Sequence, residues 1–221
     1  MFRKFFLSFY FMPVFFILAW GCFAGNVYLH HTKDILSFTQ EGGLIEDFSH
    51  FGYVLLIGAL LLFCDDYKDR VKTWGTCLFL AMCCFLREEG IHHYLSKTDT
   101  TPFKSRFFLN PNNPLGEKII FGLFLIIVLG AVLYLAIKYA KPLVVNFFKF
   151  DTISWSIGSL CAIGLIGKFI DRYPANYRKA NGASLPDDIY AIFQLVEESS
   201  EMFLPYIAVL ILAQYHFLKK N

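Results

Sequence analysis

The sequence predicts an all-α, multi-pass membrane protein built as a bundle of about six transmembrane helices. Of its 221 residues, 56% are hydrophobic and only 17% are charged, whereas soluble domains are about a quarter charged. Several apolar runs approach the roughly 20 residues that an α-helix needs to cross a bilayer. We therefore expect a single transmembrane domain over residues 1–221, with spans at about 5–28, 44–64, 74–95, 119–137, 153–170 and 189–217.

The first, fourth and fifth predicted spans are predominantly apolar. The first contains Pro13, which we expect to kink the helix. The fourth, 119–137, carries no charged residue, which favours a lipid-facing position. The fifth contains Gly158 and Ala162 at a spacing that lets two helices pack closely. A polar loop is expected after it, over residues 171–188.

The second and third spans have short apolar parts. The second has only 14 consecutive residues without a charge or histidine, 51–64, and the apolar part of the third, 74–86, has only 13. To reach the length of a bilayer core, the second helix has to extend back through 46–50 and the third has to extend forward through 87–93. Both extensions bring carboxylates and histidines into the predicted spans.

The sixth span contains three carboxylates, and we expect the other helices to supply the groups that they face. Glu197, Glu198 and Glu201 lie in a predicted helix with apolar sequence on both sides. Ionisable groups in a membrane span are costly, and they persist where they face a partner, a cavity or a bound ion. At 3.6 residues per turn, Glu197 and Glu201 share one helical face and Glu198 lies beside them.

Alternation of the spans predicts where these polar residues lie. Six spans put both termini on one side, and Arg3 and Lys4 favour the cytoplasm for that side. The polar ends of the second, third and fifth spans and the acidic half of the sixth then share the extracytoplasmic half of the membrane. The chain has no Asn-x-Ser/Thr sequon, which fits a bacterial inner membrane.

Two short motifs within this half pair a carboxylate with an imidazole. Asp47 and His50, and likewise Glu89 and His92, are three residues apart, and Glu88 precedes His92 by four. Such motifs on two helices, with carboxylates from a third, are typical of di-iron bundles and also suit one zinc ion. We therefore expect a Zn or Fe site with the ligands Asp47, His50, Glu89, His92 and Glu201, and with Glu88, Glu197, Glu198 and Glu201 as the catalytic candidates.

A salt-bridge network explains the same residues without a metal. Arg87, Lys168 and Arg172 lie in the same predicted half and can neutralise several of the acids. Three functional classes therefore stay open: a metal-dependent enzyme that hydrolyses or oxidises a lipid or lipid-linked substrate, a non-catalytic sensor or assembly subunit, and a proton-coupled carrier. The expected partners are the lipid bilayer, a lipid-linked substrate or a membrane partner subunit. Nucleic acid is not expected, because no basic cluster stands apart from the span ends.

The chain also resembles two membrane families. Over about residues 85–205 it is similar to uncharacterised bacterial inner-membrane proteins, in Arg87-Glu88-Glu89 with His93, and in 101–108, 117–120, 168–172 and 195–201. This resemblance implies an inner-membrane location and no settled activity. A looser likeness is to seven-span metal hydrolases that include alkaline ceramidases. Their late helix carries a His-x-x-x-His pair where this chain has Glu197 and Glu201.

Overall fold

The computed structural model describes residues 2–30, 35–39, 43–63, 70–90 and 105–220, and all regular elements of this part are α-helices. Five stretches of it are long and apolar enough to cross a membrane. They contain α2 (Phe11–His30), α4 (Leu44–Leu62), α8 (Leu115–Phe147), α9 (Thr152–Asn181) and α10 (Asp187–Lys219). The prediction of an all-α, multi-pass membrane protein is confirmed.

The chain divides into two compact units. The first comprises 1–66 and 144–221, and the second comprises 67–143. The first unit also contains the short helices α1 (Phe2–Phe6) and α3 (Ile35–Thr39), and the second contains α5 (Val71–Glu88) and α7 (Ser105–Leu109). A single transmembrane domain formed by both units stays a prediction.

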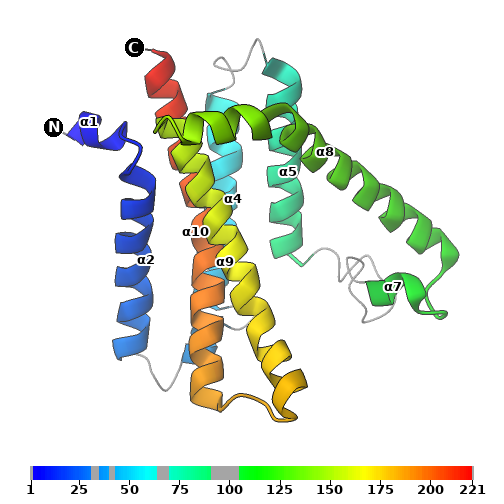
Figure 1. Ribbon diagram of the computed structural model, residues 1–221. Helices are drawn as coiled ribbons and strands as arrows, with labels where there is room; N and C mark the ends of the chain where they lie inside the picture. Colours follow the sequence, from blue (N-terminus) through cyan, green and yellow to red (C-terminus); the bar gives the residue numbers. More distant parts are fainter. Residues whose placement is uncertain (1, 31–34, 40–42, 64–69, 91–104, 221) are drawn as a thin grey trace. The chain divides into compact units, whose positions relative to one another are not determined.

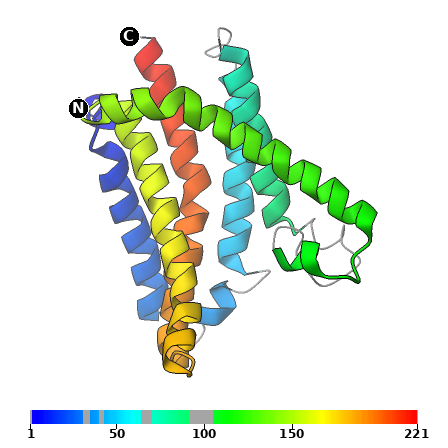
Figure 2. The same cartoon turned by 45° about the vertical axis from the view of Figure 1, so that its right-hand side comes forward.

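Helix α10 is the central element of the first unit. It packs against α9, α4, α2 and α3, and Figures 1 and 2 show α2, α4, α9 and α10 running side by side. Ala191, Leu195 and Met202 of α10 pack in one apolar cluster with α2, α3 and α4, and Ile207 and Ile211 pack in a second with α2 and α9. Because lipid tails are as apolar as these side chains, close packing stabilises such contacts in a membrane.

The closest approach between α4 and α10 depends on a glycine. A Cβ atom at Gly52 would lie 2.7 Å from Cγ of Pro205 and 2.8 Å from Cε2 of Tyr206, which is closer than real Cβ atoms come. The Tyr206 hydroxyl also donates a hydrogen bond of 2.7 Å to the carbonyl of Phe48. Gly52 therefore lets the two helices touch at the point where this bond forms.

The N-terminal span differs from its prediction. The helix expected over 5–28 is interrupted between α1 and α2, and Pro13 is the third residue of α2. In the first turn of a helix the backbone N–H groups have no intrahelical partner, so a proline costs little there. In place of a kink at Pro13, the helix is interrupted at residues 7–10, directly before α2.

Helix α5 is shorter than expected. It ends at Glu88, Glu89 is its capping residue, and Gly90 adopts a left-handed φ of 63° that stops the helix. The expected helical continuation through 87–93 is therefore wrong at Glu89 and Gly90, and residues 91–93 lie outside the described part of the chain. Among the described residues α5 is not one of the five candidate spans, and the count of six spans stays a prediction.

Helix α9 is longer than expected. The loop predicted over 171–188 is wrong as far as Asn181, because α9 continues through Pro174 to that residue. It ends at Gly182, which has a φ of 68° and whose N–H bonds to the carbonyl of Arg178 at 3.0 Å. With 30 residues in α9 and 33 in α10, the two helices are about 45 and 50 Å long. Both exceed the roughly 30 Å of a hydrocarbon core.

Candidate functional site

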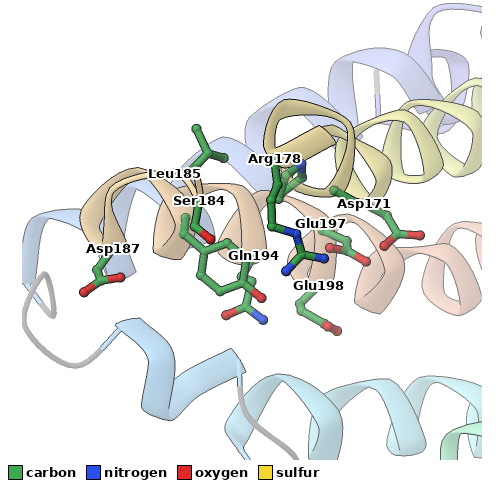
Figure 3. A pocket seen from close by; sticks show the side chains of 11 residues that line it. Asp171, Arg178, Ser184, Leu185, Asp187, Gln194, Glu197 and Glu198 are labelled. Carbon is green, nitrogen blue, oxygen red and sulfur yellow. The ribbon is translucent and has the colours of Figure 1, made fainter. Parts of the chain in front are cut away.

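A polar pocket lies between α9 and α10, next to the loop that joins them (Figure 3). Its volume is about 540 Å³, within the range of pockets that hold small molecules. All of its lining belongs to the first unit and consists of Asp171, Pro174, Ala175, Arg178, Ser184, Leu185, Asp187, Tyr190, Gln194, Glu197 and Glu198.

Helical periodicity explains why these residues meet. Residues 171, 174, 175 and 178 recur at intervals of three and four, so they share one face of α9. Residues 187, 190, 194, 197 and 198 follow the same rule on α10. Two facing helices with polar residues at this spacing produce a polar wall on each side of one cavity.

The opposite face of α10 explains the orientation of these residues. Leu195 and Met202 are at least nine-tenths buried against α2, α3 and α4. Glu197, two residues after Leu195, therefore projects from the other side of α10, towards α9. The aromatic rings of Tyr173 and Phe193 stack with their centroids 4.7 Å apart. This stack joins α9 to α10 beside the pocket.

The pocket is strongly acidic but contains one cation. Asp171, Asp187, Glu197 and Glu198 supply four carboxylates and Arg178 supplies one guanidinium, so the formal charge of the ionised lining is four minus one, or −3. Figure 3 shows the Arg178 side chain reaching from α9 towards Glu197 and Glu198. The pocket therefore offers many hydrogen-bond acceptors and one planar group of donors.

Glu201 lies one turn farther along α10 and does not line the pocket. It pairs with a lysine of α9. Its Oε1 atom lies 2.6 Å from Nζ of Lys168 on α9, and the same Nζ atom lies 3.9 Å from Oδ2 of Asp171. The Glu201 side chain is 22% exposed and that of Lys168 is 50% exposed. This arrangement is the one that the salt-bridge interpretation of the sequence expects for Glu201.

A hydrogen bond to α2 positions the buried side of the same helical turn. Trp20 Nε1 donates a bond of 2.9 Å to the Ser199 hydroxyl, which in turn donates to the carbonyl of Leu195. Ser199 is fully buried. The turn of α10 that carries Glu197 and Glu198 is thus tied to α2 on one side and faces α9 on the other.

The predicted metal ligands on α4 do not line the pocket. Asp47 is exposed, and His50 has its Nε2 atom 3.8 Å from Oε1 of Glu46. The sequence interpretation chose Asp47 as the acidic neighbour of His50, whereas the recorded contact is with Glu46, one residue earlier and one full helical turn from His50.

The remaining predicted ligands belong to the second unit. Glu88 and Glu89 lie at the end of α5, and His92 is outside the described residues. Within the part of the chain that the structure describes, no three His, Cys, Asp or Glu side chains lie close enough together to hold a metal ion. The five-ligand set includes His92, and a Zn or Fe site therefore stays a prediction.

Several lining residues were missed by the sequence interpretation. Arg178, Tyr190 and Gln194 line the pocket, yet none was a candidate. Arg178 was expected to lie in the loop 171–188, and Tyr190 and Gln194 are uncharged residues of the sixth predicted span. A signal for the longer helix was present in Arg178 and Lys179 followed by Gly182, since basic residues and then a glycine are typical of a helix C-terminus.

Comparison with known proteins gives no family. No protein-family model, curated protein or solved structure matches the chain. Both resemblances proposed from the sequence therefore stay predictions, and the function has to be inferred from the site.

Proposed function

We propose that this multi-pass membrane protein binds the amino-bearing headgroup of a lipid or lipid-linked molecule in the pocket between α9 and α10. The observation that carries this proposal is the composition of the pocket, which combines four carboxylates and one guanidinium around a cavity of about 540 Å³. Ionised side chains at a membrane span mark functional sites more often than ordinary structural positions.

The length of α10 supports a position of the pocket at the membrane boundary. A crossing needs about 20 residues, and Lys219 and Lys220 mark one end of the apolar sequence. Counting about 20 residues back from Phe217 reaches Glu198. The pocket residues 187–198 then lie at or outside the opposite boundary, where the headgroups of lipids are found.

The charges of the pocket support a ligand with both signs. An ammonium group donates charge-assisted hydrogen bonds to carboxylates such as Glu197 and Glu198, and the Arg178 guanidinium matches the geometry of a phosphate oxygen pair. A headgroup with an amine and a phosphodiester satisfies both. Because carboxylates are in excess, we assign the main recognition to the amine.

The proposal concerns binding and favours the non-catalytic interpretation of the sequence. A sensor or an assembly subunit needs a pocket and an anchored fold, and the first unit offers a polar pocket and helices of membrane length in support of this interpretation. Metal-dependent chemistry on a lipid-linked substrate stays a prediction that the metal content of the protein decides.

We also propose that the pocket opens to the outside of a bacterial inner membrane and that both termini are cytoplasmic. Reporter fusions after Asn221 should report the cytoplasm and fusions within the 182–186 loop the opposite side, and the reverse result would contradict this orientation.

Lipid titration of the purified protein tests the proposed pocket. Phosphatidylethanolamine, which has a primary amine, should bind more tightly than phosphatidylglycerol, and this preference should be lost in the double variant Glu197→Gln/Glu198→Gln. Losing charge-assisted hydrogen bonds at about 1.5–3 kcal/mol each weakens binding by roughly 10-fold or more. Native mass spectrometry of the protein with each lipid measures this change.

The matched control is Asp188→Asn, which removes an exposed carboxylate from the first turn of α10 that does not line the pocket. It should leave the preference for phosphatidylethanolamine unchanged. A double variant that keeps the wild-type preference would rule out the pocket as an amine site.

A further inference from the structure

A second polar cluster lies in the second unit, where α5 meets α8. The ammonium of Lys138 donates hydrogen bonds to the hydroxyls of Thr73, at 2.8 Å, and of Tyr134, at 3.0 Å. Thr73 is also 2.8 Å from the hydroxyl of Tyr139. The ammonium lies 5.3 and 5.2 Å from the ring centroids of Tyr134 and Tyr139, within the distance of a cation–π contact.

The positive charge of this cluster has no carboxylate partner in the described part of the chain. An ammonium has three donors, and Lys138 uses two of them for the two hydroxyls. Lys72 lies near enough to interact electrostatically with Tyr134, and Lys141 is one helical turn beyond Lys138 on the same side of α8. The Lys138 and Lys72 ammonium groups thus stand near hydroxyls that can also donate to an anion, and Lys141 adds a third positive charge on the same side of α8.

The position of the cluster along α8 matches the headgroup layer. The uncharged stretch 119–137 is 19 residues long, or about 28 Å of helix, which is close to the thickness of a hydrocarbon core. Lys138 is the first charged residue after this stretch. Tyrosine and lysine at such a point are typical of the level at which lipid phosphates lie.

We propose that Lys138, Lys72 and Lys141, with the hydroxyls of Thr73, Tyr134 and Tyr139, bind the phosphate of an anionic phospholipid. Basic pockets between membrane helices recognise anionic headgroups in this way. The Thr73 and Tyr134 hydroxyls hold the Lys138 ammonium in place, and a phosphate would supply the negative charge that the described residues do not place beside it. This site is separate from the pocket between α9 and α10 and does not depend on the function proposed for it.

Competitive lipid binding to the full-length protein in detergent tests this site. The probes are phosphatidylglycerol, phosphatidylcholine with the same acyl chains, and inorganic phosphate, and the readout is lipid bound per protein by native mass spectrometry. Wild-type protein should prefer phosphatidylglycerol. Lys138→Gln should raise the concentration of phosphatidylglycerol at half-saturation about fivefold, as expected for one lysine near a membrane surface. Lys138→Arg keeps the positive charge and should lose less affinity for this lipid.

If Lys138→Gln fails to fold, a second variant tests the same site. Lys141 has no recorded side-chain contact within the described residues, so Lys141→Gln should fold normally and weaken phosphatidylglycerol binding by a similar factor. Lys149→Gln is the matched control, because Lys149 is an equally exposed lysine of the first unit. Equal binding of both lipids, or an equal loss in Lys149→Gln, would overturn the proposal. Displacement of the lipid by millimolar inorganic phosphate would assign the site to soluble phosphate and would overturn it as well.

Discussion

Two polar regions of α10 differ in what their side chains contact. Near the C-terminal end, Gln214 is fully buried, accepts a hydrogen bond of 2.6 Å from the Ser156 hydroxyl and donates one of 2.6 Å to the carbonyl of Phe6. Near the N-terminal end, Glu197 and Glu198 are half-buried and face a cavity. In the first region, protein groups supply the hydrogen-bond partners of the polar side chain, whereas the second region has room for a ligand.

The physical reason for this difference is the cost of burying polar groups. A buried amide that lacks a hydrogen-bond partner costs about 1–3 kcal/mol, so Gln214 is tolerated at its position only with its two partners. Carboxylates at a cavity keep access to water or to a ligand and avoid this cost. We therefore expect substitutions near Gln214 to change stability and substitutions in the pocket to change binding.

The largest effect is expected at Gln214. In Gln214→Leu the Phe6 carbonyl and the Ser156 hydroxyl both lose a partner, which should lower the free energy of unfolding by about 3 kcal/mol. Thermal unfolding of the purified protein measures this change. The control is Gln194→Leu, a pocket substitution that should change stability by less than about 0.5 kcal/mol. Equal effects of the two substitutions would break the distinction between the two regions.

A smaller effect is expected where α4 touches α10, between these two regions. In Gly52→Ala the new methyl group would meet Pro205 and Tyr206 at 2.7 and 2.8 Å, so we expect a loss of about 2 kcal/mol from overpacking. Gly58→Ala on the same helix is the control, because a Cβ atom there meets no atom within 4 Å. If Gly52→Ala melts at the same temperature as Gly58→Ala, the contact between α4 and α10 is looser than the structure indicates.

Much of the fold could be predicted because apolar runs of membrane length are a strong signal. The start of α4 at Leu44 followed from the need for about 20 residues in a span. The extension of α9 from residue 171 to 181 did not follow, since a helix outside the hydrocarbon core has no apolar run to identify it. The helix also continues through Pro174, which removes a backbone hydrogen bond from it.

The candidate site was predictable only in part. Glu197 and Glu198 were identifiable from the cost of carboxylates near a membrane span, but their neighbour Arg178 depended on the unexpected length of α9. The contact between Trp20 and Ser199 joins residues that are 179 positions apart. Neither periodicity nor composition indicates such a long-range pair, because both describe only local sequence.

The smallest effect is expected at the ion pair between the two regions, where the salt-bridge and metal hypotheses for Glu201 give different results. Lys168 is half-exposed and Glu201 is about one-fifth exposed, so breaking their contact should cost no more than about 1 kcal/mol. Lys168→Met leaves the Glu201 carboxylate without its cation, and Glu201→Gln leaves the lysine with only the more distant Asp171 carboxylate, at 3.9 Å. The double variant Lys168→Met/Glu201→Gln leaves neither charge unpaired. It should therefore be more stable than the sum of the two single changes predicts.

Thermal unfolding and elemental analysis of wild type and these three variants, all purified without chelators, separate the two hypotheses. If Glu201 is only an ion-pair partner, the double variant recovers part of the lost stability and the metal content is the same in all four proteins. If Glu201 is a metal ligand, wild-type protein carries stoichiometric Zn or Fe and Glu201→Gln loses most of it. Lys168→Met would then keep its metal, because an ammonium group cannot be a ligand and its removal takes a positive charge away from a cation site.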